Sequence, residues 1–319
     1  MKAEAEIRPR IGVSRCLLGD AVRYDGGHKR DRFVVGELGR HAELLPVCPE
    51  LEAGFGVPRE AMHLEGDPSS PRLVTLRSGR DLTDEMTTWA DARARELARM
   101  RLDGFVLKAK SPSCGLERVP IYGERGQAPR PGRGLFAEAL VAALPDLPVE
   151  EEGRLRDPTL RENFVVRVFA HRRFRLAAEP PLSRRALVEF HTHHKMLLMS
   201  RDETRMRALG RLVAEAHNLD LDELFSSYRR EFFRGMSRRP STEKHTNTLQ
   251  HIAGHLRGRI DDWDRRELAG VIDRFRRGEL PLAAALTLLR HYIDKHDVPY
   301  VRDQAYLHPH PDDLVPRAG

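Results

Sequence analysis

The sequence has 319 residues, of which 40% are hydrophobic and 32% are charged; this composition is typical of a folded globular protein and excludes an intrinsically disordered chain. Its length exceeds what one hydrophobic core usually supports, so we expect two domains. No run of about 18 apolar residues occurs, which excludes a membrane-spanning helix, and residues 1–10 lack the apolar core of a signal peptide, so we expect a cytoplasmic protein.

The net charge of +6 is unevenly distributed along the chain. Residues 1–150 contain 23 basic and 23 acidic side chains, whereas residues 151–319 contain 31 basic and 25 acidic side chains and 12 of the 15 histidines. A neutral half joined to a basic half predicts a small-molecule site on the first and a surface for a polyanion on the second. The alternative is a solvated helical surface that is simply rich in arginine.

In chain order, the first half alternates short apolar runs with amphipathic stretches. We expect strands at residues 11–13, 45–47 and 104–107, a hairpin formed by 72–76 and 81–82, and helices at 33–44, 83–100 and 135–144. Thr83 is the expected N-cap of the second helix. Strands that alternate with helices of this length predict an α/β domain with a doubly wound, mostly parallel sheet.

Residues 145–158 contain three prolines and three consecutive glutamates, and we expect a linker there. Beyond it the apolar residues follow the period of a helix. Helices are expected at 160–176, 183–199, 205–217, 221–236, 242–259, 264–276 and 282–296, with Ser183 and Thr242 as N-caps. The sequence therefore predicts an α/β domain over residues 1–150 and an all-α domain over residues 151–319.

The three cysteines, Cys16, Cys48 and Cys114, each follow one of the runs predicted as strands. An odd number of cysteines in a cytoplasmic chain argues against disulfides, and gaps of 32 and 66 residues do not match a zinc motif. Because open α/β sheets bind ligands beyond the carboxyl ends of their strands, we expect the three thiols in one crevice. Three thiolates would leave one iron of a [4Fe-4S] cluster open to a sulfur donor, whereas three unrelated buried thiols are the alternative.

The neighbourhoods of the cysteines carry four motifs. Residues 16–19, 22–26, 48–50 and 108–115 read CLLG, VRYDG, CPE and KAKSPSCG. In this order they resemble the family formerly called domain of unknown function 523, typified by thiouracil desulfidases. The resemblance implies that the three cysteines bind a [4Fe-4S] cluster, and that the sulfur of a thiolated uracil binds the fourth iron without a redox change.

The second half resembles the helical family called domain of unknown function 1722. The matching residues are 190–191, 194–195, 245–247, 272–273 and 276–279. Proteins that join the two domains resemble desulfidases that act on 4-thiouridine in tRNA, which implies that the helical domain recognises RNA. The basic excess of residues 151–319 agrees with that partner.

The expected reaction is non-redox desulfuration, in which water attacks the ring carbon and uracil or uridine leaves with release of sulfide. Glu50, next to Cys48, is the candidate general base or acid, and Ser111 and Ser113 are candidates to orient water or the pyrimidine. The alternatives are that Glu50 caps a helix beginning near residue 51 and that the serines stabilise their own turn.

Five further residues are candidates for binding the substrate: Ser14, Tyr24, Asp25, Lys108 and Lys110. The two lysines would also offset the negative charge of the cluster. The alternatives are that Tyr24 and Asp25 form only a turn and that the lysines are solvated.

In the helical half, basic residues are candidates to contact RNA phosphates: Arg201, Arg205, Arg207, Arg211, Arg229, Arg230, Arg234, Arg238, Arg239, Lys195 and Lys244. The aromatic residues among them, Tyr228, Phe232 and Phe233, are more typical of a core than of a base-stacking surface. His251 and His255 have metal-binding spacing without an evident third ligand. Two other functions stay open: a free-base 2-thiouracil desulfidase, and a non-catalytic Fe–S sensor that binds nucleic acid.

Overall fold

The computed structural model describes residues 7–123 and 129–314, and the chain divides into two compact units, Met1–Leu160 and Arg161–Gly319. The two units are described separately below. Within the described residues, no helix combines the length and the apolar character that crossing a membrane requires.

The first unit is built on a four-stranded sheet in which every neighbouring pair of strands is parallel. Its order is β2-β1-β5-β8, with β1 at Arg10–Ser14, β2 at Glu43–Val47, β5 at Gly104–Leu107 and β8 at Val149–Glu151. The central strands β1 and β5 are almost entirely buried, which is why their sequences are short continuous apolar runs. The three strands predicted for this region are confirmed, and so is the mostly parallel α/β class.

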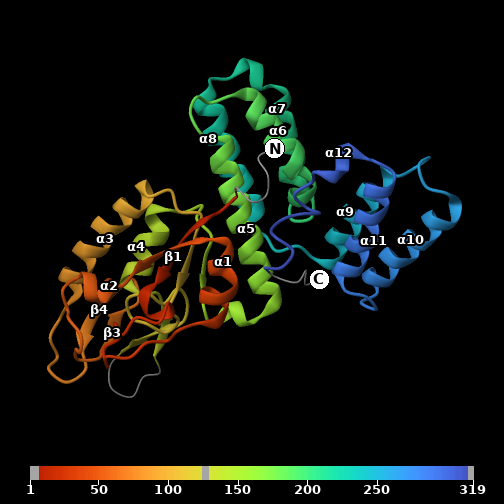
Figure 1. Cartoon of the computed structure of the whole chain (residues 1–319). Helices are drawn as coiled ribbons and strands as arrows, with labels where there is room; N and C mark the ends of the chain where they lie inside the picture. The colour runs from red at the N-terminus through yellow and green to blue at the C-terminus, as the bar shows by residue number, and fades with distance from the viewer. Residues whose placement is uncertain (1–6, 124–128, 315–319) are drawn as a thin grey trace. The chain divides into compact units, whose positions relative to one another are not determined.

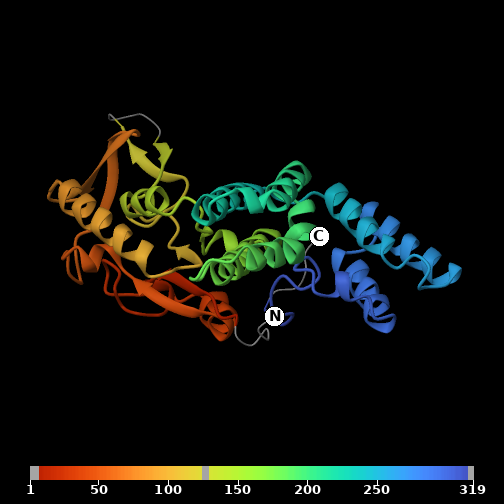
Figure 2. The ribbon, with the colours of Figure 1, turned by 90° about the horizontal axis from the view of Figure 1, so that it is seen from above.

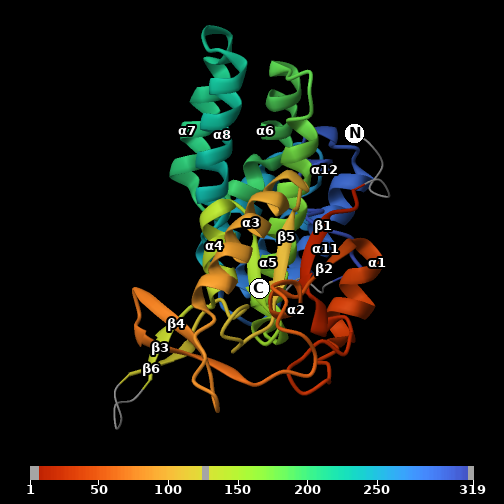
Figure 3. The ribbon, with the colours of Figure 1, turned by 90° about the vertical axis from the view of Figure 1, so that its left-hand side faces the viewer.

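Helices cover both faces of this sheet. Helices α3 (Thr83–Arg99) and α4 (Leu135–Ala143) lie side by side, and Figures 1 and 3 show α1 (Gly39–His41) on the opposite side of β1. Phe105 of β5 and Phe136 of α4 meet in the core between sheet and helices. The helix expected at residues 33–44 is shorter, because a π-helical turn at Phe33–Leu38 and α1 end before β2 begins.

A second four-stranded sheet, which the sequence did not predict, has the order β4-β3-β6-β7. Its strands are β3 at Met62–Asp67, β4 at Ser70–Thr75, β6 at Val119–Tyr122 and β7 at Arg130–Gly132. The expected hairpin is confirmed only as a short one: Val74 and Asp81 form an antiparallel bridge, flanked by hydrogen bonds from the Thr75 N–H to the Arg80 carbonyl and from the Leu82 N–H to the Leu73 carbonyl. Along its whole length, β4 pairs antiparallel with β3 instead.

Two other expectations for the first unit are corrected. Thr83 is the first residue of α3 rather than its N-cap; Leu82 holds the N-cap position, and the Thr83 hydroxyl oxygen accepts the N–H of Leu73 at 2.9 Å. The segment 145–158 is not a plain linker, because β8 lies within it and pairs with β5.

The described elements of the second unit are all helical, as predicted (Figure 2). The helices are α5 (Pro158–Ala177, which begins within the first unit), α6 (Arg184–Met199), α7 (Glu203–Ala214), α8 (Leu221–Met236), α9 (Thr242–Gly254), α10 (Asp262–Arg276), α11 (Leu282–Lys295) and α12 (Pro299–Arg302). Ser183 is the N-cap of α6, as expected, whereas Ser241 rather than Thr242 caps α9.

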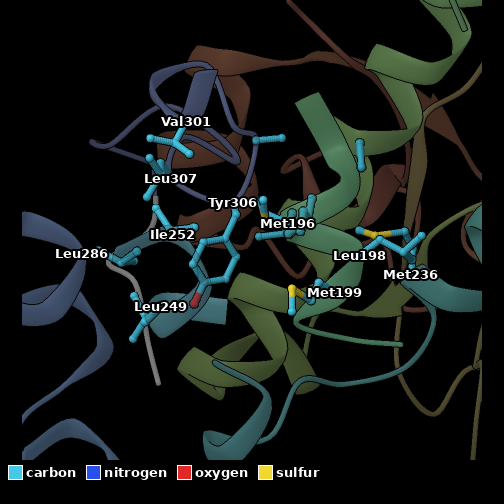
Figure 4. Packing of buried hydrophobic residues seen from close by; sticks show 14 of the residues in the cluster. Met196, Leu198, Met199, Met236, Leu249, Ile252, Leu286, Val301, Tyr306 and Leu307 are labelled. Carbon is cyan, nitrogen blue, oxygen red and sulfur yellow. The ribbon is translucent and has the colours of Figure 1, made fainter. Parts of the chain in front are cut away.

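The core of the second unit joins several helices around aromatic side chains. Figure 4 shows the ring of Tyr306 between Met196 and Met199 of α6 on one side and Leu249 and Leu286 of α9 and α11 on the other. The aromatic residues of α8, Tyr228, Phe232 and Phe233, are buried in the same core. These three rings therefore pack the interior and do not form a base-stacking surface.

Candidate functional site

The three cysteines lie at one edge of the parallel sheet. Cys16 follows β1 in a 3-10 turn, Cys48 comes directly after β2, and Cys114 lies in the loop after β5. Because β2, β1 and β5 are neighbouring parallel strands, their carboxyl ends share this edge. All three cysteines line a single cavity of about 430 Å³, which is the convergence that the strand order predicts.

Cys48 begins the short helix α2 (Pro49–Glu52). Its backbone N–H donates to the Glu52 carboxylate at 2.8 Å, and Pro49 occupies the first helical position, where no N–H is needed. Glu52, rather than Glu50, is thus the acidic side chain that stabilises the start of this helix. Glu50, the other acidic residue of α2, lines the cavity.

The loop that carries Cys114 is fixed by its own serine and by α4. The Ser111 hydroxyl oxygen accepts the N–H groups of Ser113 at 3.2 Å and of Cys114 at 3.1 Å. The carbonyl of Ser113 accepts the N–H of Ala137, in the first turn of α4, at 3.1 Å. A Cβ on Gly134 would lie 2.4 Å from the Ser113 carbonyl oxygen, so this close approach requires glycine.

Two glutamates at the end of β8 hold the Cys114 loop from both sides. The Glu152 carboxylate accepts the N–H of Ala109 at 2.6 Å and pairs with the Lys108 ammonium. The Glu151 carboxylate accepts the N–H of Leu116 at 2.8 Å. Neither role was predicted, because an acidic, proline-containing segment is typical of a linker.

Two effects act in opposite directions on the pKa values of the thiols: burial raises all three, and nearby cations lower those of Cys16 and Cys48. Burial raises the pKa of Cys16 to about 11 and also raises the pKa values of Cys48 and Cys114. Lys108 and Arg23 act in the opposite direction on the pKa of Cys16. Free thiols in this cavity are therefore neutral at pH 7, and metal binding would release their protons into a setting that already holds positive charge.

Glu50 is the acidic residue that lines the cavity among the described residues, and it is fully hydrogen-bonded. Its Oε2 atom accepts Nε of Arg59 at 3.0 Å and also pairs with Nη2 of the same guanidinium. Its Oε1 atom accepts the hydroxyl of Ser113 at 2.6 Å and that of Ser111 at 3.3 Å. Arg59 was not among the predicted site residues, because nothing in its local sequence indicates this contact.

The other predicted site residues fall into two groups. Ser14, Tyr24, Lys108, Lys110 and Ser111 line the cavity. Ser113 is fully buried behind Glu50 and is not among the lining residues.

Asp25 is also outside the lining, and its Oδ1 atom accepts the N–H of Gly27 at 3.0 Å, as the turn alternative expects. Tyr24, next to it, is 43% exposed and is one of the residues that line the cavity. Lys110 is exposed and has a positive φ of 61°, an uncommon conformation for a residue with a side chain. Their roles in binding a substrate stay predictions.

In the described part of the chain, no group of three or more His, Cys, Asp or Glu side chains is arranged to hold a single metal ion. Thiolates that bind a cluster attach to different irons, so their spacing differs from that of the ligands of one ion. His251 and His255, whose ring centroids lie 5.7 Å apart, have no third such side chain beside them in the described residues.

The basic residues predicted to contact phosphates are mostly engaged within the protein. Arg201 is only 2% exposed and donates to the carbonyls of Met236 and Arg238, so it is excluded from an RNA-facing surface. Four others pair with carboxylates: Arg205, Arg207, Arg234 and Arg238. Lys244 donates to the Arg201 carbonyl at 2.6 Å, and Lys195 lies over the ring of Tyr300.

Known proteins that are similar to parts of this chain include two curated bacterial proteins and one solved structure. The chain is 32% identical over 147 residues to the uncharacterized protein YbgA of Escherichia coli (strain K12), covering 46% of this chain and 87% of that protein. It is 32% identical over 113 residues to the uncharacterized protein YbbK of Bacillus subtilis (strain 168), covering 33% of this chain and 72% of that protein. A solved structure of the [4Fe-4S]-dependent thiouracil desulfidase TudS matches at 29% identity and a TM-score of 0.38, covering 49% of this chain and 98% of that one.

Two protein families match successive parts of the chain. Residues 11–152 match the family described as 2-thiouracil desulfurase, and they contain all three cysteines and the whole cavity lining. Residues 195–311, within the helical unit, match the protein family of unknown function DUF1722. The chain therefore belongs to the 2-thiouracil desulfurase family through its α/β unit and to the DUF1722 family through its helical unit.

Proposed function

We propose that this protein hydrolyses the carbon–sulfur bond of a thiolated uracil, with 4-thiouridine in tRNA as the substrate, and releases uridine and sulfide. The observation that carries the proposal is the cavity in which Cys16, Cys48 and Cys114 meet the carboxylate of Glu50. Family membership supports thiolated uracil as the substrate class.

The donor set fits a [4Fe-4S] cluster bound by three thiolates. Cys16, Cys48 and Cys114 would hold it, and the cluster would supply one iron with an open position for the sulfur of the substrate. Lys108, Arg23 and Arg59 line the same cavity and would stabilise the thiolates, since each of them lowers the pKa of one of these cysteines.

The residues around the cavity would accept the proton of the attacking water and contact the substrate. Hydrolysis forms a carbon–oxygen bond, breaks the carbon–sulfur bond and transfers no electrons, so it needs a proton acceptor but no redox partner. Ser111 lines the cavity and donates to Glu50, so a proton from the attacking water would pass through its hydroxyl to the carboxylate. Tyr24, which lines the cavity and is 43% exposed, would contact the pyrimidine with its ring.

The basic excess of residues 151–319 supports tRNA as the partner. Among the candidate cations, Arg211, Arg230 and Arg239 are exposed and carry no ion pair within the described residues. They would contact phosphates. A free-base 2-thiouracil desulfidase is the second candidate, because the matching family is described by that base.

Anaerobic reconstitution with iron and sulfide, followed by measurement of sulfide release, tests both candidates. The wild type, Cys114→Ala and a matched control, Ser69→Ala in the β3–β4 turn, are compared on 4-thiouridine-containing tRNA and on free 2-thiouracil. We expect release from tRNA by the wild type and the control, falling as salt rises, and none by Cys114→Ala. Release from the free base alone would favour the second candidate, and bound iron without any release would favour a non-catalytic sensor.

A further inference from the structure

Arg59 lies between α2 and β3, and its side chain, only 6% exposed, is surrounded by acceptors. Its Nη1 atom donates to the carbonyls of Val22 at 3.1 Å and Gly56 at 2.8 Å, and its backbone N–H donates to the carbonyl of Tyr24 at 3.0 Å. Its Nε and Nη2 atoms both face the same oxygen of Glu50. The guanidinium is thus held on three sides by contacts of fixed geometry.

These contacts join the loops that carry the three cysteines. Val22 belongs to the loop that follows Cys16, and Glu50 belongs to the helix that begins at Cys48. The second oxygen of Glu50 accepts the hydroxyl of Ser113, next to Cys114, at 2.6 Å. One guanidinium and one carboxylate therefore connect all three loops through protein atoms alone.

We propose that Arg59 is the positioning residue of this site, which fixes the Glu50 carboxylate so that its Oε1 atom faces Ser111 and Ser113. The inference rests on the proposed function, in which Glu50 receives the proton. A glutamate side chain has several rotamers. Glu50 is held in one of them because two donors of the planar Arg59 guanidinium, Nε and Nη2, bind its Oε2 atom.

Lysine cannot reproduce this arrangement. An ammonium keeps the positive charge but has no planar fork, so it cannot bind Oε2 of Glu50 and the carbonyls of Val22 and Gly56 in the same geometry. Arg59→Lys should therefore retain the charge near the cluster and lose the orientation of Glu50. Misplacement of a reacting group by about 1 Å can reduce turnover by about a hundredfold, and we expect a loss of that order in kcat with a smaller change in KM.

A double-mutant cycle tests whether Arg59 acts through Glu50. Sulfide release and iron content are measured for the reconstituted wild type, Arg59→Lys, Glu50→Gln and the double variant, with Arg72→Lys as the matched control. Arg72 is an exposed arginine of the same unit that pairs with Glu65. We expect Arg59→Lys to lower kcat in the wild-type background, to add little to Glu50→Gln, and to leave iron content unchanged.

Three results would overturn the proposal: independent, multiplicative losses in the cycle, a loss of iron in Arg59→Lys, or a crystal structure of Arg59→Lys in which Glu50 still accepts the Ser113 hydroxyl. The crystal structure needs no activity, so it tests the position of Glu50 even when the wild type fails to release sulfide. Failure of the wild type alone would count against the proposed function and not against the role of Arg59 in orienting Glu50.

Discussion

Replacing Glu152 with glutamine tests how the Cys114 loop is held. The side chains of Glu152 and Lys108 are 11% and 19% exposed, so their ion pair is largely removed from water. Glutamine keeps an oxygen that can accept the N–H of Ala109 but leaves the Lys108 ammonium without its counter-charge. Removing one partner of a buried pair costs about 3–5 kcal/mol, and partial exposure places this one at the lower end, about 3 kcal/mol.

Thermal denaturation of the full-length protein, followed by circular dichroism, measures this loss. For a unit of about 160 residues, about 3 kcal/mol lowers the midpoint by roughly 6–12 °C. The matched control is Glu117→Gln, in the same region, whose carboxylate is 49% exposed and pairs with Arg154 at 3.1 Å. A surface pair contributes less than about 1 kcal/mol, so the control should shift the midpoint far less. Equal shifts in the two variants would refute the idea that Glu152 anchors this loop.

Three further predictions concern the interior and the site. Burial lowers the pKa of His191 to about 4, so its contribution to stability is fully present above pH 6.5 and should fall by up to about 3 kcal/mol as the pH drops towards 4. Burial also lowers the pKa of His194, which adds to the same pH dependence, so His191→Gln should reduce the slope seen in urea denaturation without removing it. Gly134→Ala should reduce iron uptake on reconstitution, because the added Cβ would displace the Ser113 carbonyl. The control is Gly36→Ala, where no heavy atom lies within 4 Å of the added Cβ, and it should take up iron as the wild type does. Asp25→Asn should leave KM within about twofold of the wild type, because an amide oxygen can still accept the N–H of Gly27, whereas a tenfold rise would give Asp25 a role in binding.

The positions of the cysteines could be predicted from the sequence because they depend on local patterns. Each of three short apolar runs is a parallel strand, buried in β1 and β5 and partly exposed in β2, and a thiol follows each one at the edge where ligands bind. Local patterns do not report the strand order, and the loops meet because β2, β1 and β5 are neighbouring strands. The helices of the second half were predictable for the same reason, because their period of apolar residues is a local property.

The predictions were wrong where a strand or side chain has its partner far away in the sequence. They were also wrong where two adjacent residues could both serve as the N-cap of one helix. The parallel pairing that joins β3 to β6 was missed because its partners, such as Leu64 and Ile121, lie 57 residues apart in the sequence, which no local pattern reports. The N-cap of α9 was misplaced by one residue because Ser241 and Thr242 both have capping side chains, and only the backbone of Ser241 is extended. The contacts of Arg59 and Glu152 also join distant segments, which is why neither residue was singled out.

The charge of the first unit shows why composition alone misleads about its site. Residues 1–150 contain equal numbers of acidic and basic side chains, yet the cavity is lined by six basic residues and, among those described, a single acidic one. Two of the compensating carboxylates are not lining residues: Asp20 pairs with Arg15, and Glu152 pairs with Lys108. Basic lining residues lower the pKa values of Cys16 and Cys48, but burial raises the pKa values of all three thiols by more, so they become thiolates only when a ligand displaces the protons. A neutral composition of the unit is therefore compatible with a cavity whose lining is strongly positive. The lining is positive because the basic partner of each of these two ion pairs lines the cavity and the acidic partner does not.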